Sequence, residues 1–166
     1  MIITSTRLAT VLTLAACLAS PLAQAQAVRS EKNISLELAN QIAAGAVAAC
    51  SANGYNVAAS VVDRAGTVRV IQRADNAGPH TLASSQAKAY TSASAKNTTQ
   101  AMMEGAQKNP AAANLVYLPG FLLLGGGVPI KVGNDVIGAV GVGGAPGGHL
   151  DEQCAVAAID KVKDLL

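Results

Sequence analysis

Residues 125–155 read GGGVPIKVGNDVIGAVGVGGAPGGHLDEQCA, and the fold depends most on this stretch. Two short β-branched runs, residues 130–132 and 136–137, are separated by Gly133 and Asn134. These residue types supply the positive φ values that a tight hairpin turn needs. We therefore expect the two runs to pair as antiparallel neighbours.

The segment after this hairpin has very little side-chain bulk. Residues 140–144 read VGVGG, and glycines in a strand let a second backbone, a helix or a flat ligand approach closely. Asp151 and Glu152 follow, and acidic residues in a first helical turn interact favourably with the positive end of the helix. We expect a final helix here, with backbone crowding as the reason for the glycines.

The first 25 residues have the pattern of a secretory signal peptide. Arg7 precedes an apolar run at residues 8–19, Pro21 follows, and residues 23–25 read AQA, which signal peptidase accepts. The apolar run is shorter than the roughly 20 residues of a spanning helix. We expect cleavage after residue 25, a periplasmic or secreted protein, and no spanning membrane segment.

A second processing route is open at Cys17. Residues 14–17 read LAAC, the spacing of a bacterial lipoprotein site, which would leave a lipid on Cys17. The ordinary site fits better because it follows a longer apolar core and a proline. In either case residues 26–166 are expected to form a single domain that is long enough to bury a hydrophobic core.

Charge and composition exclude some functions. The chain has 12 Lys and Arg and 10 Asp and Glu residues, so loss of Arg7 with the signal peptide leaves a net charge of +1. Basic blocks with interleaved aromatic residues are missing, and nucleic acid is therefore not an expected partner. With three Tyr, one Phe and no Trp, the core must consist of small aliphatic residues, which favours close packing of helices on a sheet.

Periodicity and turn residues predict an alternating order of elements along the mature chain. This order is typical of an α+β fold in which helices flank an antiparallel sheet. The expected elements are a helix at 35–51, strands at 56–63 and 67–73, a helix at 81–96, short helices near 98–107 and 110–114, a strand at 116–124 interrupted by Pro119 and Gly120, the two hairpin strands, and the final helix.

Cys50 and Cys154 are the cysteines of the predicted mature chain. They stand near the end of the first helix and the start of the last, where antiparallel helices on one face of the sheet would bring them together. In an oxidising compartment this pattern allows a disulfide, and two small buried thiols are the alternative. Neither cysteine has a neighbouring His or basic cluster, so a catalytic thiol is not expected.

Four motifs in register resemble the GlcG/HbpS heme-binding family, also called the heme-degrading domain family. They are VVDRAGTVRVIQRADNAGP at 61–79, AKAYTSAS at 87–94, GGGVPI at 125–130 and DVIGAVGVGGAPGGHLDEQCA at 135–155. The resemblance extends from about residue 35 to residue 166. It implies a profilin-like fold with a five-stranded antiparallel sheet, compact homo-oligomers and, in some members, binding of heme or a related tetrapyrrole.

Reversible heme binding needs an axial iron ligand from a His, Cys, Met or Tyr side chain. Covalent attachment is excluded because no Cys-x-x-Cys-His run exists. His80, at the end of a Gly-Pro loop and the start of a helix, is the candidate iron ligand. Lys88 is a candidate propionate contact, and Tyr90 is a candidate phenolic ligand or hydrogen-bond donor. The alternatives are an exposed helix-start histidine, an interface lysine and a packed tyrosine.

His149 is a further candidate for contact with heme or metal. It lies in a glycine loop just before Asp151. A histidine beside a helix N-terminus is disfavoured as a cation, so a neutral hydrogen-bonding loop residue is the alternative. Nucleotide-binding glycine motifs, a nucleophile elbow and structural zinc spacing are all missing.

These observations favour an exported, oligomeric protein that binds heme or a related tetrapyrrole for storage, buffering or sensing. This function needs no catalytic residues, and any heme breakdown would be secondary. One alternative is an enzyme or accessory subunit for a small organic acid, bound by Arg69 or Arg73, His80 and the glycine-rich loop. Another is a structural homo-oligomeric module that uses the arginine-bearing strand face as its interface.

Overall fold

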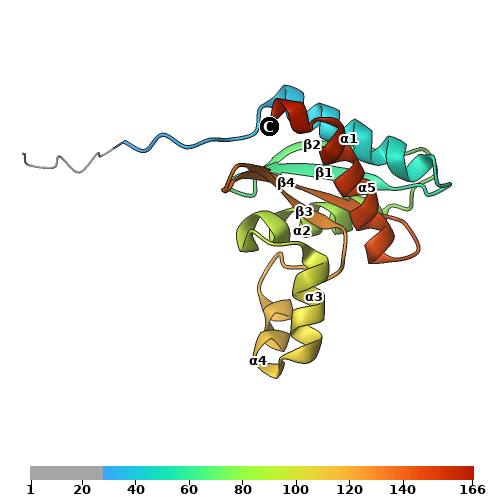
Figure 1. Ribbon diagram of the computed structural model, residues 1–166. Helices are drawn as coiled ribbons and strands as arrows, with labels where there is room; N and C mark the ends of the chain where they lie inside the picture. The colour runs from blue at the N-terminus through green and yellow to red at the C-terminus, as the bar shows by residue number, and fades with distance from the viewer. Residues whose placement is uncertain (1–27) are drawn as a thin grey trace, which may run out of the picture. The chain divides into compact units, whose positions relative to one another are not determined.

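The computed structural model describes residues 28–166, and the predicted signal peptide, its cleavage site and Cys17 lie outside these residues. In chain order (Figure 1) the elements are α1 (Leu36–Ser51), β1 (Ala58–Asp63), β2 (Val68–Arg73), α2 (His80–Ala95), α3 (Thr99–Lys108), α4 (Pro110–Ala113), η1 (Asn114–Tyr117), β3 (Gly127–Val132), β4 (Asp135–Gly143), α5 (Gly148–Lys161) and η2 (Lys163–Leu165).

The strands form one antiparallel sheet in the order β2-β1-β4-β3. The predicted hairpin is confirmed: β3 and β4 pair up to Val132 opposite Asp135, and Gly133 in the turn has a φ of 61°. Residues 138–143 of the nine-residue β4 also pair with β1, so β4 is one of the two central strands and is buried along most of its length.

The sheet has four strands, so the expectation of five is wrong for this chain. The missing strand is the one predicted at residues 116–124, where the backbone instead continues from η1 into a turn. Pro119 has no N–H for a strand ladder, and Gly120 has a φ of 82°, which reverses the chain. The bond from the N–H of Phe121 to the carbonyl of Leu118 closes that turn.

Helices cover both faces of the sheet, as the order of elements predicted. Figure 1 shows α1 and α5 side by side on one face and α2 on the opposite face. Between α1, α5 and the sheet lies the main core of small aliphatic residues, and a smaller cluster around Ala89 and Ala139 lies under α2. Residues 31–166 form one compact unit.

The glycines of β4 do allow close backbone approach. A Cβ atom added at Gly141 would collide with the carbonyl oxygen of Ser85 and the backbone of Ala89, both in α2. On the same face, the hydroxyls of Ser60 and Ser85 share a hydrogen bond of 2.8 Å. Strand-to-helix crowding, one of the explanations offered by the sequence, therefore accounts for Gly141.

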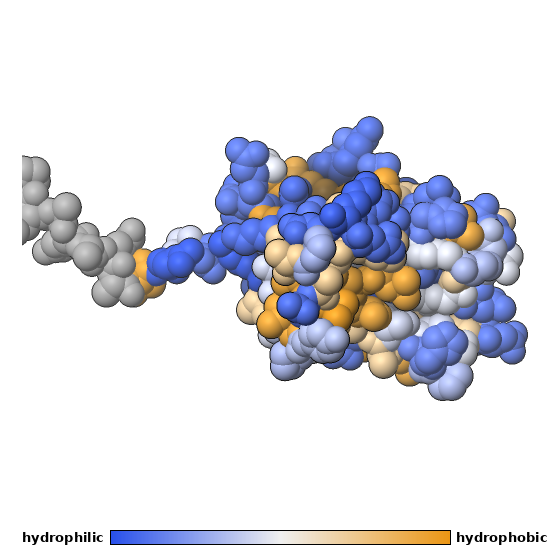
Figure 2. Space-filling view, turned by 90° about the horizontal axis from the view of Figure 1, so that it is seen from below, coloured by the Kyte–Doolittle hydropathy of each residue, from blue (hydrophilic) through white to orange (hydrophobic). Residues whose placement is uncertain are grey.

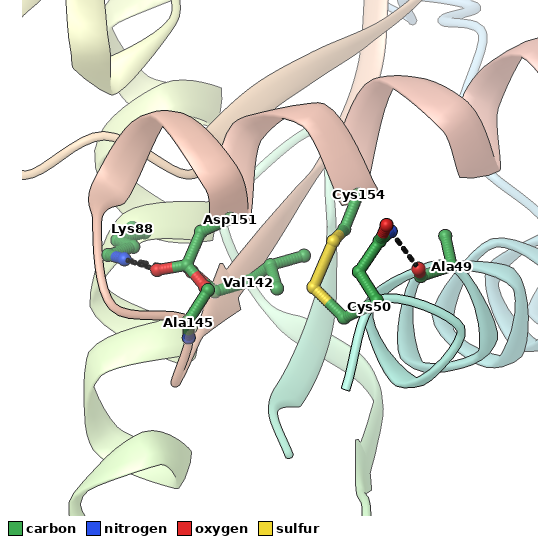
Figure 3. The surroundings of a disulfide bond; sticks show 8 residues. Ala49, Cys50, Lys88, Val142, Ala145, Asp151 and Cys154 are labelled. Carbon is green, nitrogen blue, oxygen red and sulfur yellow. Dashed lines mark hydrogen bonds and ion pairs between the residues drawn. A yellow bond between two sulfur atoms is a disulfide. The ribbon is translucent and has the colours of Figure 1, made fainter. Parts of the chain in front are cut away.

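A disulfide joins the end of α1 to the second turn of α5 (Figure 3). Cys50 and Cys154 are bonded, with their Cα atoms 5.4 Å apart, and the closed loop spans 104 residues. Gly45 faces Ala158 further along the same two helices, so α1 and α5 run antiparallel. Between residues 28 and 166, no helix is both long and apolar enough to cross a membrane.

Candidate functional site

Helix α2 carries three of the candidate site residues, His80, Lys88 and Tyr90, and has very few charged side chains. Its sequence, HTLASSQAKAYTSASA, contains one Lys and no Arg, Asp or Glu. That lysine, Lys88, is only 1% exposed. The solvent-facing side of a 16-residue helix is therefore free of Lys, Arg, Asp and Glu.

Lys88 points into the protein and is held by a buried carboxylate (Figure 3). Its Nζ atom lies 2.7 Å from Asp151 Oδ2 and 2.9 Å from the carbonyl oxygen of Val142. Asp151 Oδ1 accepts a hydrogen bond of 2.9 Å from the N–H of Ala145. The pair thus ties α2 to β4 and α5, and Lys88 is not available at the surface for a propionate or a partner subunit.

Burial raises the pKa of Asp151 above its ordinary value, although the Lys88 ammonium and the N–H groups of Ala145 and Gly144 act in the opposite direction. Removing two charged groups from water is costly, and only their mutual attraction and their backbone bonds offset that cost. The role of this pair is to position elements.

Tyr90 lies on the outer side of α2 and is enclosed by glycines. The residue is 37% exposed, and its ring meets that of Phe121 edge-on, with centroids 6.2 Å apart. A Cβ atom at Gly66 would lie 2.8 Å from Tyr90 Cδ2, and one at Gly120 would lie 3.1 Å from Cε1. The hydroxyl of Thr91 accepts a bond from the N–H of Leu122, which holds the 118–124 segment against α2.

A cavity of about 300 Å³ opens beside Tyr90. It is lined by Gly66, Ala83, Gln86, Ala87, Tyr90 and Gly120, none of which carries a charge. Figure 2 views the protein from below, with α3 and α4 nearest the viewer, and shows apolar residues gathered near the middle of this face. On α2 itself, Leu82 and Tyr90 are partly exposed. Small, uncharged walls and one phenol suit a flat aromatic ligand.

His80 is the first residue of α2 and is exposed. Its ring folds back over Gly78, where an added Cβ would lie 2.7 Å from the ring carbon Cε1. Ten residues separate His80 from Tyr90, a rise of about 15 Å along a helix, so the two side chains cannot ligate the same iron. His80 does not line the Tyr90 cavity.

His149 has a similar position at the start of α5, with its exposed ring against Gly147. It lines a second cavity, which we call the α5 cavity, of about 340 Å³. The other lining residues are Gln100, Glu152, Gln153, Val156, Ala157 and Asp160. Two of these are acidic, and their carboxylates would repel the propionates of a heme.

Sequence reasoning missed the α5 cavity, although a signal was present. Its α5 residues recur at helical spacing, from His149 through Glu152 and Val156 to Asp160. Such a stripe marks one face of the helix, and here the face mixes acidic and apolar residues. The contribution of Gln100 from α3 had no sequence signal, because it depends on how α3 is placed.

Arg69 and Arg73 are exposed at alternate positions of β2, an edge strand. Neither of the two cavities is lined by them or by His80. Within residues 28–166, no group of three or more His, Cys, Asp and Glu side chains is arranged to hold a metal ion.

Known proteins resemble this chain in sequence and in structure. Protein GlcG of Escherichia coli K12 is 34% identical over 109 residues, which span 66% of this chain and 80% of GlcG. A double mutant of HbpS from Streptomyces reticuli is 36% identical, with a TM-score of 0.77 over 87% of this chain and 97% of HbpS.

A second solved structure, a PduOC:heme complex, shares the fold at 23% identity, with a TM-score of 0.69 over 77% of this chain and 94% of PduOC. The family model described as "Haem degrading protein HbpS-like" matches residues 34–160. With that match over most of its length, this chain belongs to the HbpS-like family.

Proposed function

We propose that this protein is an exported binding protein for heme or a related tetrapyrrole, held without a covalent bond on the outer face of α2. The observation that carries the proposal is the uncharged cavity beside Tyr90. The HbpS-like family and the heme complex of PduOC, a protein of the same fold, support the choice of ligand.

The residues present fit such a ligand in two respects. Ala83 and Ala87, with the two glycines, offer a flat apolar surface to the ring. The Tyr90 hydroxyl is a chemically suitable iron ligand. The propionates would need an exposed cation, and Arg69, which follows Gly66 by three residues, is the candidate since Lys88 is buried.

The cavity volume is at the lower end of the roughly 300–1,000 Å³ of typical ligand sites. A tetrapyrrole would therefore extend beyond it, over the neighbouring apolar surface or under a second copy of the chain. This arrangement agrees with a homo-oligomer that stores, buffers or senses the ligand. It requires no catalytic residue, and heme breakdown would be a secondary reaction of the bound iron.

The test is a titration of residues 26–166 with hemin, followed by the Soret absorption band. We expect a saturable, shifted band that Ala83→Glu weakens at least tenfold, because the substitution puts a carboxylate in the cavity. Ser94→Glu, an equivalent change at an exposed α2 position outside the cavity, is the control and should bind normally.

Ligand identity is tested with tyrosine and histidine variants. Tyr90→Phe should shift the band, whereas Tyr117→Phe, at a residue 80% exposed on η1, should not. A band abolished by His80→Ala instead would move the site to the start of α2. No band above that of free hemin would reject the proposal, and thermal stabilisation by small carboxylates would then favour the organic-acid alternative.

Export is tested separately by fractionating bacteria that express the full chain. We expect a periplasmic or secreted protein whose first residue is Gln26. A membrane-bound form beginning at a lipid-modified Cys17 would support the lipoprotein route, and an uncleaved chain in the cytoplasm would contradict export.

A further inference from the structure

The two edges of the sheet differ in the backbone groups that they present. One edge strand is β3, and the bond from the N–H of Val142 to the carbonyl of Gly126 shows which of its residues face β4. Gly127 and Pro129 alternate with these and point away from β4. The N–H of Gly127 donates a bond of 2.8 Å to the Thr99 hydroxyl, and proline has no N–H. At both positions this edge is therefore closed to a further strand.

The edge formed by β2 is open. The N–H of Ala74 donates a bond of 2.9 Å to the carbonyl of Val57, so the backbone groups of Ala74 are directed at β1. Because these groups alternate in direction along an antiparallel strand, those of Ile71 and Arg73 point away from β1. Among residues 28–166, no strand pairs with this edge. Such a row of donors and acceptors is what an added strand requires.

The side chains of the β2 edge are basic and apolar. Arg69, Ile71 and Arg73 are exposed at alternate positions, and neither arginine forms a salt bridge with another described residue. The helices on the two faces add little charge, because the one lysine of α2 is buried and Glu37 is the only charged residue of α1. Asp75 lies beyond the end of the strand. The edge is therefore suited to carboxylates.

The same arginines act against pairing of β2 with a second copy of itself. In an antiparallel pair centred on Ile71, Arg69 of each copy would lie opposite Arg73 of the other. Like charges directly opposite each other destabilise a strand pair. A strand with carboxylates at these two positions would gain from the contacts that a second copy would lose.

We propose that the β2 edge binds an extended acidic segment of another protein by strand addition. The backbone of this segment bonds to Ile71 and Arg73, its carboxylates contact Arg69 and Arg73, and an apolar side chain between them packs on Ile71. No residue of β2 lines the Tyr90 cavity, and the inference therefore goes beyond heme binding.

The experiment uses a capped peptide, Thr-Glu-Thr-Val-Thr-Glu-Thr, and a second peptide with lysine in place of glutamate. Amide hydrogen exchange in residues 26–166 is followed by NMR. We expect saturable binding of the acidic peptide only. The amides of Ile71 and Arg73 should exchange rapidly in the free protein and at least tenfold more slowly when the peptide is bound. Those of Val70 and Gln72, which face β1, should be protected throughout.

Charge variants test the role of the arginines. Arg73→Glu should weaken binding of the acidic peptide at least tenfold, whereas Lys131→Glu, at an exposed position on the closed β3 edge, is the matched control and should bind normally. Arg69→Glu combined with Arg73→Glu should bind the lysine peptide instead, which shows that the edge is still formed.

Four results would each overturn the proposal. They are no binding of the acidic peptide, equal binding of both peptides, binding that leaves exchange at Ile71 and Arg73 unchanged, and protection of these two amides that rises with protein concentration when no peptide is present. The last result would identify a second copy of the chain as the partner.

Discussion

Single residues decide how charge is distributed in this protein. Lys88 and Asp151 are 63 positions apart, yet they form a buried ion pair that connects two helices on opposite faces of the sheet. The sequence placed Lys88 at a surface because lysine is rarely buried without a partner. Asp151 is identified as this partner only by the tertiary structure, in which α2 and α5 pack on the sheet.

Lys88→Met tests the stabilising role of this pair. We expect a loss of about 3–5 kcal/mol in the free energy of unfolding, because the change leaves an uncompensated carboxylate in the interior. Urea unfolding followed by circular dichroism measures this loss. The double variant Lys88→Met with Asp151→Leu should be more stable than Lys88→Met alone, and a double variant as unstable as the sum of the two single changes would show that the charges are not coupled.

Glu152→Gln tests the cost of a carboxylate in the α5 cavity. Because burial raises the folded-state pKa of Glu152 above its ordinary value of 4.5, the folded protein binds more protons than the unfolded chain between these two pKa values. Its contribution therefore favours folding at low pH and is lost as pH rises from about 4.5 through the raised pKa. The difference in unfolding free energy between Glu152→Gln and the unmodified protein should grow in favour of the variant over this window, and a constant difference would contradict it.

At the scale of elements, the distance between α2 and β4 depends on glycine. A side chain at Gly141 would meet the backbone of α2 at Ser85 and Ala89, and neither backbone can move without displacing the helix. The predicted crowding is confirmed at this position. The sequence left open whether a helix, a subunit or a ligand contacts Gly141, because glycines in a strand allow close approach by any of them.

Gly141→Ala should lower the free energy of unfolding by about 1–3 kcal/mol or more, as overpacking of a core does. Thermal and urea unfolding measure the effect. Gly105→Ala in α3 is the control, since a Cβ there meets nothing within 4 Å, and it should be neutral or stabilising by about 0.5–1 kcal/mol. A similar response of both variants would mean that crowding is not the cause.

At the scale of the whole molecule, the disulfide closes most of the described chain into a loop. With Cys50 and Cys154 separated by 104 positions in the sequence, loop-closure entropy predicts a stabilisation of up to about 4.7 kcal/mol. We expect reduction with dithiothreitol to lower the melting temperature clearly, and Cys50→Ala with Cys154→Ala to reproduce the reduced protein and to be insensitive to dithiothreitol. No change on reduction would mean that the bond is not formed in solution.

The sequence by itself determined the family and the order of the helices and strands, except for the strand predicted at residues 116–124. The Gly133 turn was predicted because it depends only on neighbours within a few residues, and the Ser35 hydroxyl, which accepts from the N–H of Leu38 at the start of α1, is a contact of the same local kind. The tertiary structure decided the rest. Residues 116–124 form no strand and lie against α2 near Tyr90, Lys88 is buried, and Gln100 lines the same cavity as Glu152. The sequence could not predict these outcomes, because burial and charge pairing depend on groups that are distant in sequence and meet only when the helices pack on the sheet.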